Sequence, residues 1–320
     1  EPPFISSVDS GNLAACLLTC AQDVRVLLPQ LSACYHSLAA RMDALAEGMR
    51  FDALYDAEAD LFRIGVHPLQ DAPSGGHYDL LASESRLLSF VAIMLGQVPV
   101  RHWYRLGRLY TRVPGGAQAF ISYNGTMFEY LMPELFLPLK TGGALWESAR
   151  FCLYVQRRDR AGGGLWGQSE SAFFSLDPSL SYRYKAHGCQ SLALRRGMGA
   201  DMVVSPYSSF LALAVEPRAA VRNLRRLCER GFTGRFGLWE AVDFTPSRTS
   251  GRGGESVRCV MSHHLGMSLV AIDNALTEDV MQRRFLSDRT MAAYRELLQE
   301  RVPVGAPIMR QTEGDIPEKL

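Results

Sequence analysis

The feature that most constrains this chain is a repeated helical pattern of apolar residues, interrupted by long loops rich in glycine and proline. One example is the 3.6-residue spacing of Leu38, Met42, Leu45 and Met49. Polar residues 9–12 suit a helix start before 13–18, and 51–66 is typical of a hairpin with a polar turn. The pattern predicts further helices over 31–49, 78–95, 128–137, 144–158, 207–215, 217–230, 257–276 and 287–301. Long glycine-rich loops in such a domain are usually functional, so the residues alone predict a mainly α, enzyme-sized domain.

Composition and charge narrow the function classes. The chain has 320 residues, 47% hydrophobic and 21% charged, which is enough for a substantial core in one large domain or two small ones. Its formal net charge is +1, and no basic stripe with interleaved aromatic residues occurs, so we expect no nucleic-acid partner. Arg222, Arg225, Arg226 and Arg230 follow helical spacing and indicate the solvated face of an amphipathic helix.

The seven cysteines are scattered and form no CxxC pair, which favours neither a zinc site nor a redox motif. Free thiols in apolar runs are typical of a reducing compartment. The start of the sequence shows no leader pattern, and we expect the chain to be a segment of a larger protein. The longest apolar run, around 90–95, is too short to span a bilayer. We predict no metal site and no cofactor.

Two glutamates lie in aromatic, glycine-punctuated settings. Glu170 follows Trp166-Gly167-Gln168-Ser169, and Glu240 follows Trp239 within 235–246. Hydrolysis of a sugar–sugar bond by two carboxyl groups needs one that stays protonated in apolar surroundings and one that is ionised. Flat aromatic rings beside them offer stacking faces to sugars. A single glutamate of this kind is more often a solvated residue or a helix cap. The residues alone therefore do not decide between a catalytic and a structural role for either glutamate.

Several stretches resemble one family when they are taken together. They are 8–14, 78–86, 98–108, 125–133, Trp166-Gly167-Gln168-Ser169-Glu170-Ser171, 182–186, 239–248 and Met261-Ser262-His263-His264-Leu265-Gly266. In this order they resemble the central glycoamylase-like domain of bacterial cyclic β-1,2-glucan synthases, which is similar in fold to endo-β-1,2-glucanases. The resemblance implies an (α/α)6 barrel over 1–307, with long active-site loops and a small β-hairpin near 51–66. Residues 308–320 are then a C-terminal tail or linker.

The resemblance also implies a substrate and a mechanism. The substrate is β-1,2-glucan, cleaved and rejoined with retention to close a ring through a covalent glycosyl-enzyme. Glu170 matches the family's acid/base position and Glu240 its nucleophile position, an order the sequence does not fix. Hydrolysis of the same polymer, with or without inversion, and a non-catalytic glucan-holding module are the alternatives. No Trp-Asn-Asp motif of the related phosphorylases occurs.

Further residues follow from the same motifs as predicted substrate contacts. They are Tyr78, Asp79, Glu84, Arg86, Tyr123, Glu129, Trp166, Tyr207, Trp239, Asp243, His263 and His264. We expect covalently linked glycosyltransferase and phosphorylase-like domains, and a cytoplasmic location as a soluble domain of an inner-membrane protein.

Some of these residues have equally good structural readings. Asp79 could cap a helix, and Glu129 could form a buried ion pair. His263 and His264 are adjacent, which makes them poor joint metal ligands, so we expect one of them to bind a sugar or a carboxylate. The chain departs from the family pattern at Tyr123, Gln168 and His187, where the family typically has Trp, Ile and Phe.

Overall fold

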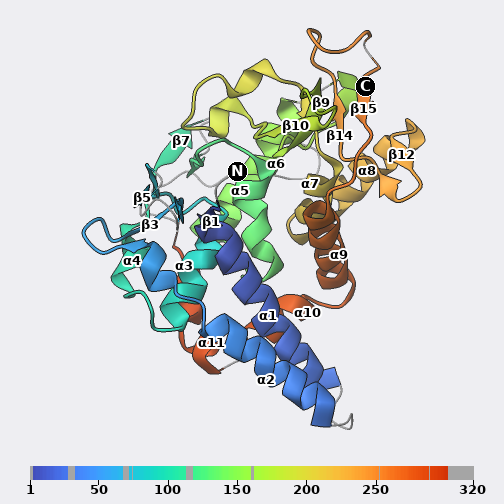
Figure 1. The fold of residues 1–320 in the computed structure, drawn as a ribbon. Helices are drawn as coiled ribbons and strands as arrows, with labels where there is room; N and C mark the ends of the chain where they lie inside the picture. The colour runs from blue at the N-terminus through green and yellow to red at the C-terminus, as the bar shows by residue number, and fades with distance from the viewer. Residues whose placement is uncertain are drawn as a thin grey trace. The chain divides into compact units, whose positions relative to one another are not determined.

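The chain folds into helices joined by short strands, and about half of the described residues are helical (Figure 1). The structure is a computed structural model that describes residues 3–27, 33–67, 72–73, 75–112, 118–159, 162–251, 253–287 and 289–301. Every strand pair within these ranges is antiparallel, and no sheet there closes into a barrel. Among the same residues, no helix combines the length and apolar composition needed to cross a bilayer.

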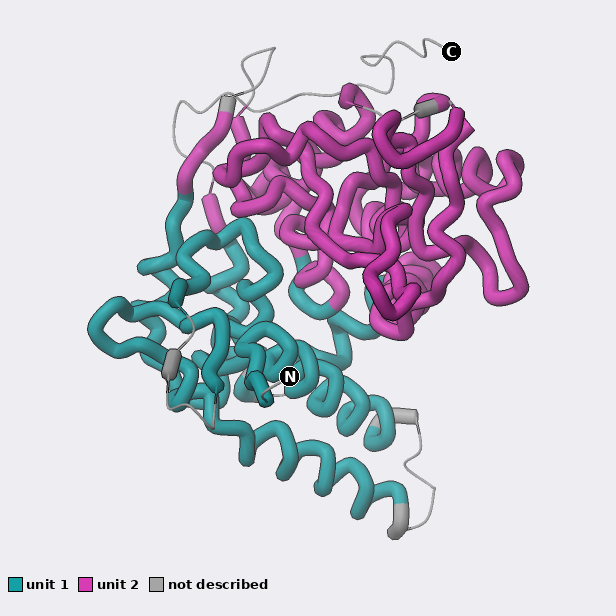
Figure 2. Tube along the Cα trace, turned by 45° about the horizontal axis from the view of Figure 1, so that its top comes forward, with its two compact units in different colours: residues 1–108, 136–138, 279–299 teal, residues 109–135, 139–278, 300–320 magenta. Residues whose placement is uncertain are grey.

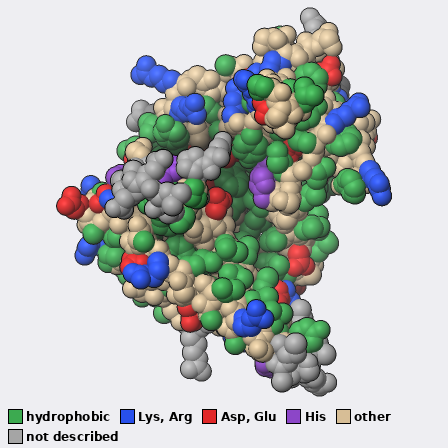
Figure 3. Space-filling model, viewed as in Figure 1, with side chains coloured by type: hydrophobic (Ala, Val, Ile, Leu, Met, Phe, Trp, Pro, Cys, Tyr) green, Lys and Arg blue, Asp and Glu red, His purple; other side chains and the backbone are tan. Residues whose placement is uncertain are grey.

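The chain separates into two compact units, shown in Figure 2. Unit 1 takes its described residues from 1–108, 136–138 and 279–299, and unit 2 takes the others. The expected tail, 308–320, lies outside the described residues. On the face shown in Figure 3, basic and acidic side chains are interspersed, in keeping with the small net charge.

Unit 1 is organised around a long first helix, α1 (Ser7–Leu27), which packs against α2 (Ala33–Glu47), α3 (Ser85–Met94) and α10 (Val280–Phe285). A Cβ on Gly11 would lie 2.6 Å from the Cα of Leu88, so glycine at this position allows α1 and α3 to cross closely. Gly11 therefore lies inside α1 and not before it, and the helix begins earlier than the sequence indicated. The remaining elements are α4 (Arg101–Arg105), α11 (Arg289–Ala293), η1 (Phe51–Leu54), η7 (Arg295–Leu298), β1 (Ile5–Ser6), β2 (Tyr55–Asp56), β3 (Leu61–Arg63), β4 (Gly65–His67), β5 (Ala72–Pro73) and β6 (His77–Tyr78).

Unit 2 is built on the sheet β11-β14-β15, formed by Val203–Val204, Ala241–Asp243 and Glu255–Val257. Successive side chains of β14 enter different cores: Ala241 packs with Val203 and Val257, and Val242 packs with Leu165 and Phe244. Because both faces of β14 are buried, the residue that precedes it is held firmly in place.

The other strands and helices of unit 2 surround this sheet. The helices are α5 (Met127–Leu131), α6 (Ala144–Arg158), α7 (Pro206–Leu211), α8 (Pro217–Glu229) and α9 (Ser262–Leu276), with 3-10 turns at Met132–Leu135, Gly162–Gly164, Gln190–Leu192, Met198–Ala200 and Ala212–Ala214. The strands are β7 (Tyr110–Arg112), β8 (Gln118–Phe120), β9 (Ser171–Leu176), β10 (Tyr182–Lys185), β12 (Thr233–Gly234) and β13 (Gly237–Leu238).

The structure confirms several predicted elements and corrects others. The helices over 31–49, 128–137, 144–158, 207–215 and 217–230 are present with shifts of a few residues, as is the hairpin in which Tyr55 pairs with Phe62. The helix predicted from 78 begins only at Ser85, because Tyr78 pairs with Phe62 in a strand. The helix predicted from 257 begins at Ser262, because Val257 belongs to β15.

Two other regions also differ from the sequence prediction. Residues 161–183, predicted to be rich in loops, contain β9 and the start of β10. The C-terminal part contains α10, which was not predicted, and the helix expected over 287–301 is reduced to α11 and a 3-10 turn.

Candidate active site

Glu170 and Glu240 each stand directly before a strand, at the starts of β9 and β14. These strands belong to different sheets and are joined through two carboxylates: the N–H of Ala172 donates to Glu240 Oε1 at 3.3 Å, and that of Phe174 donates to Asp243 Oδ2 at 3.1 Å. Both strands run in the same direction between these two hydrogen bonds, from Ala172 to Phe174 and from Glu240 to Asp243. The two glutamates therefore emerge at the same end of the strand pair.

Glu240 is a buried carboxyl group that meets N–H groups at both oxygens. Besides the amide of Ala172, Nδ1 of His264 lies 2.9 Å from Oε2. The glutamate is 6% exposed and the histidine 3%. When Glu240 is ionised it can only accept hydrogen bonds, so Nδ1 is the donor of this bond. Nε2 of His264 lies 3.4 Å from the hydroxyl of Tyr184.

Glu170 has the opposite surroundings. Burial raises the pKa of its carboxyl to about 7, and the charge of nearby Glu129 adds to the shift. No donor among the described residues forms a hydrogen bond with this carboxyl that would favour its ionised form. A carboxyl group with a pKa near neutrality can donate a proton to a leaving oxygen and later take one back.

Tyr207 contacts a neighbour of each glutamate. Its hydroxyl is 2.8 Å from Oγ of Ser169, and its ring stacks on the imidazole of His264 with centroids 3.7 Å apart and planes 8° apart. Burial raises the pKa of its phenol well above the ordinary value, and negative charge on Tyr184, Glu170 and Glu240 raises it further. Both glutamates therefore lie within electrostatic reach of one phenol.

A cavity of about 310 Å³ opens beside Glu240 within unit 2. It is bounded by α7, the β12–β13 hairpin and α9, and its lining is mostly apolar. Such a cavity is large enough for a sugar ring. Its lining includes Tyr207, Phe210, Phe236, Trp239, Glu240 and His264.

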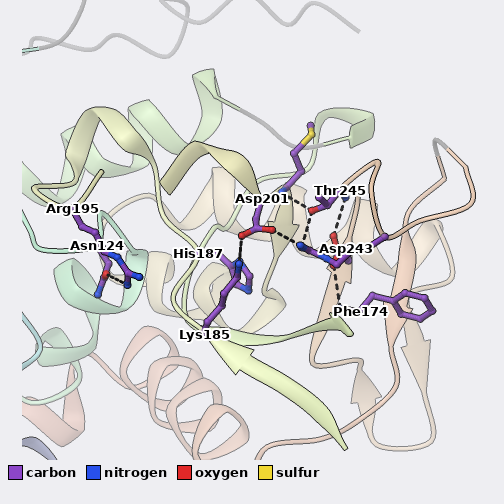
Figure 4. Close-up of polar contacts among 10 residues, drawn as sticks. Asn124, Phe174, Lys185, His187, Arg195, Asp201, Asp243 and Thr245 are labelled. Carbon is purple, nitrogen blue, oxygen red and sulfur yellow. Dashed lines mark hydrogen bonds and ion pairs between the residues drawn. The ribbon is translucent and has the colours of Figure 1, made fainter. Parts of the chain in front are cut away.

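An ionic cluster lies further along the same strands, as Figure 4 shows. Arg248 bonds Asp243 through Nε at 2.9 Å and also pairs with Asp201, which in turn pairs with Lys185. Burial would raise the pKa of Asp243, yet hydrogen bonds from Arg248 and Thr245 hold it below its ordinary value. The cluster thus joins β9, β10, β14 and the segment before β11.

The comparisons with known proteins decide the family. A model of the glycoamylase family, described as glucoamylase, matches residues 76–289. The chain belongs to the glycoamylase family. It is 40% identical over 268 residues to the cyclic β-(1,2)-glucan synthase NdvB of Rhizobium meliloti (strain 1021), a match that covers 83% of this chain and 9% of that protein. The predicted family resemblance is therefore confirmed.

Solved structures of the same fold lie further away in sequence. The endo-β-1,2-glucanase of Chitinophaga pinensis, in complex with sophorotriose and glucose, is 16% identical with a TM-score of 0.68, over 92% of this chain and 71% of that chain. The β-1,2-glucanase of Parabacteroides distasonis is 14% identical with a TM-score of 0.67, over 92% of this chain and 45% of that chain. As a member of the glycoamylase family, the chain is an enzyme of the glycoside hydrolase or transglycosylase type.

The structure places the predicted site residues unevenly. Within unit 2, Trp239 and His264 adjoin Glu240 and line its cavity, and His263, the neighbour of His264 on α9, is exposed. Tyr123 is 55% exposed in the turn before α5, open to a ligand. Trp166 is 5% exposed, packed into the core beside Glu170's segment.

Two predicted substrate contacts are engaged within the protein. Asp243 is fully buried in the ionic cluster. Glu129 is 2% exposed, and its oxygens accept from Ser122, Asn124 and Thr126, which completes a capping box at the start of α5. Glu129 is therefore the third helical residue of a capping box whose N-cap is Thr126, and its role as a sugar contact stays a prediction.

The four remaining predicted contacts belong to unit 1, whereas both glutamates belong to unit 2. Tyr78 lies in β6, and Asp79 is exposed ahead of α3 without capping it, since Oγ of Ser83 accepts from the first helical amide. Glu84 immediately precedes α3, and Arg86 is 2% exposed, with a hydrogen bond to the carbonyl of Leu81.

The sequence did not predict a role for three residues that contact and orient the site residues. Tyr184, which reaches His264, lies in the Tyr-Arg-Tyr-Lys motif at 182–185 but received no role. Ser169 and Arg248 were likewise quoted only as parts of motifs. Their spacing along the chain carries no sign of these contacts, so only the motifs themselves could have drawn attention to them.

Proposed function

We propose that this glycoamylase-family domain is a transglycosylase that cleaves and rejoins β-1,2-glucosidic bonds with retention. Glu170 is the acid/base and Glu240 the nucleophile. The observation that carries this assignment is the contrast between two carboxyl groups at one end of a strand pair. One is poor in donors with a raised pKa, and the other meets N–H groups at both oxygens.

The two steps of the reaction follow from this contrast. Glu240 attacks the anomeric carbon while protonated Glu170 gives its proton to the leaving glucosyl oxygen, which leaves a covalent glycosyl-enzyme. Glu170, now ionised, takes the proton from an incoming sugar hydroxyl as that oxygen displaces Glu240. If the incoming hydroxyl belongs to the other end of the same glucan, the product is a ring. Trp239, Tyr123 and His263 are the proposed sugar contacts.

The β-1,2-glucan substrate is supported by the NdvB relative and by the glucanases of the same fold. Hydrolysis of this polymer is the second candidate, because those glucanases are hydrolases by name. A glucan-holding module without turnover is the third. The separation of the carboxyl groups distinguishes retention, whether by transfer or by hydrolysis, from inverting hydrolysis: about 5–5.5 Å suits direct attack by a carboxylate, and about 6.5–9.5 Å leaves room for water.

The test is product analysis with linear β-1,2-glucan. Transglycosylation predicts cyclic or re-sized glucans and retention of the anomer by NMR, whereas the hydrolytic alternative predicts shorter linear chains only. Separate Glu170→Gln and Glu240→Gln variants should each lose about a thousandfold or more in kcat, since each removes an essential group of a two-carboxyl mechanism.

Glu216→Gln is the matched control for these variants. Glu216 is a partly buried glutamate of unit 2 whose partner is Arg157, with Nη1 2.8 Å from its carboxylate, and it lies in neither strand of the site. It should lose stability but keep its activity within about threefold. Full turnover in both active-site variants would contradict every enzymatic reading of these glutamates, and glucan binding without turnover would favour the holding module.

We also infer the larger context. The chain spans 9% of NdvB, so we propose that it works within a longer synthase, beside glycosyltransferase and phosphorylase-like domains, in an inner-membrane protein that carries it on the cytoplasmic side. We further propose that it contributes to an (α/α)6 barrel. An experimental structure of a longer segment would test the barrel by the number of paired helices, and protease accessibility in inverted vesicles would test the orientation.

A further inference from the structure

A continuous line of contacts connects the neighbours of the two glutamates. Nδ1 of His264 contacts Glu240 at 2.9 Å, the imidazole stacks on Tyr207 at 3.7 Å, and the Tyr207 hydroxyl reaches Oγ of Ser169 at 2.8 Å. Ser169 is the residue before Glu170. Each joint in this line is a direct contact, with no gap wide enough for water.

Tyr207 is fixed at both ends of this line. It is the second residue of α7, which follows β11, and β11 pairs with β14 directly after Glu240. On the other side, Oγ of Ser169 also accepts from the amide of Phe128, so the serine that meets the phenol is itself held. The phenol is 4% exposed, and a buried aromatic ring stacked on one face has few alternative rotamers.

The hydroxyl and one face of Tyr207 are thus engaged by protein groups. These two features are the ones a sugar would use, hydrogen bonding to the hydroxyl and stacking on the ring. The role of the side chain is better explained by what it separates: the segment that carries Glu170 on one side and the imidazole that orients Glu240 on the other.

We propose that Tyr207 is a positioning residue that sets the separation of Glu170 and Glu240, and thereby keeps direct attack by Glu240 ahead of attack by water. The proposal rests on the proposed transglycosylation and adds what fixes its outcome. The physical reason is that an increase of a few ångströms in carboxyl separation distinguishes a site for direct attack from one that admits water between carboxyl and sugar. A misplacement of about 1 Å can by itself cost about a hundredfold in rate.

Two variants probe the two joints. Tyr207→Phe keeps the stack on His264 and removes the contact with Ser169, and Tyr207→Leu removes both. We expect kcat to fall about tenfold in the first and about a hundredfold in the second, with KM within about twofold. The hydrolysed share of product should rise several-fold over the transferred share in both.

Tyr130→Phe is the matched control. Like Tyr207, Tyr130 is a buried tyrosine of unit 2 with a hydrogen-bonded hydroxyl, but this hydroxyl donates to the backbone carbonyl of Phe120 at 2.6 Å. It should lose similar stability and keep the wild-type ratio of hydrolysis to transfer. If Tyr207→Phe and Tyr130→Phe show the same product ratio and the same kcat, Tyr207 is only structural and the proposal is overturned.

A measurement without substrate separates this proposal from the proposed function. Glutamate carboxyl carbons labelled with 13C are titrated by NMR, and Glu170 is assigned by comparison with Glu170→Gln. In the wild type the pKa should be about 7. The titratable groups that act on this carboxyl or are acted on by it are Glu129 and Tyr207, and beyond Tyr207 lie Tyr184, Glu240 and His264.

Release of the Ser169 segment lets water reach Glu170, so its pKa should fall toward the ordinary range in both Tyr207 variants and stay unchanged in Tyr130→Phe. An unchanged Glu170 titration in Tyr207→Leu overturns the proposal, even where the wild type cleaves no glucan. A shifted titration in a wild-type background that turns over no β-1,2-glucan leaves the positioning role standing and removes the proposed function alone.

Discussion

Replacing His187 by phenylalanine should stabilise the protein, and the gain should grow as the pH falls. The imidazole is 1% exposed, and neither ring nitrogen has a hydrogen-bond partner among the described residues. Its ring meets Phe173 edge-on with centroids 5.6 Å apart, so a phenyl ring would find an aromatic neighbour. A buried polar group without a partner costs about 1–3 kcal/mol. The variant should therefore gain about 1 kcal/mol or more in free energy of unfolding at pH 7.5.

The pH dependence follows from the depressed pKa of this histidine. Burial lowers it from 6.5 to about 4, against the attraction of Asp201. Between these values the unfolded chain binds a proton that the folded protein does not, so stability falls as the pH decreases. At about 1.4 kcal/mol per pKa unit, the loss is about 2 kcal/mol at pH 5 and about 3 kcal/mol below pH 4. The phenylalanine variant lacks this loss.

Glu170 contributes with the opposite sign. Its pKa is raised from 4.5 to about 7, so the folded protein holds a proton that the unfolded chain releases, and stability falls as the pH rises through that window. The two contributions offset each other in the wild type, whose own stability curve therefore tests neither. The difference between the wild-type and variant curves cancels the part due to Glu170 and isolates His187.

The assay is urea unfolding followed by circular dichroism at pH 7.5, 6.5, 5.5 and 5.0. The difference should widen by about 2 kcal/mol from the first to the last. The exposed histidine His36 offers a control, since His36→Gln should track the wild type. Parallel curves for His187→Phe and the wild type would refute the assignment of a buried imidazole without a hydrogen bond, as would a variant less stable at pH 7.5.

Three further predictions concern unit 2. The rate constant kcat/KM should fall about tenfold per pH unit above about pH 7 as Glu170 loses its proton, and a profile without this limb would argue against its acid role. Asp243→Asn should cost about 1.5–3 kcal/mol by urea unfolding, because it removes the buried charge that accepts a hydrogen bond from Arg248 and leaves that guanidinium only Asp201 as its partner, and a loss below about 0.5 kcal/mol would contradict this. Gly188→Ala should destabilise by about 2 kcal/mol or more, since its Cβ would lie 1.9 Å from the carbonyl oxygen of Asn124, while Gly199→Ala, with its nearest neighbour at 3.9 Å, should be near neutral in thermal melts.

Sequence pattern predicted the longer helices well because their information is local. The helix over 144–158 was found with its observed bounds, Ala144–Arg158, since it begins after a glycine and keeps its apolar spacing throughout. The strands of unit 2 were mostly missed for the opposite reason. β11 has two residues and β14 has three, too few for an alternation of apolar and polar residues to show.

The candidate site was predictable in its main residues and not in their support. The motifs pointed to Glu170, Glu240 and His264, and the expectation that one histidine would bind a carboxylate is confirmed at 2.9 Å. The contacts that orient these residues depend on packing between segments far apart in the chain. The roles of the two glutamates stay predictions until the variants are assayed.

The bond from Ala172 to Glu240 has a consequence for how this enzyme can change over time. In most sheets the backbone alone joins neighbouring strands, and side chains are free to vary; here the proposed nucleophile itself forms one of the hydrogen bonds between two sheets. A lineage that abandoned the chemistry would still lose stability on discarding this glutamate. The residue should therefore persist in inactive descendants of the domain, where its presence would not be a sign of turnover.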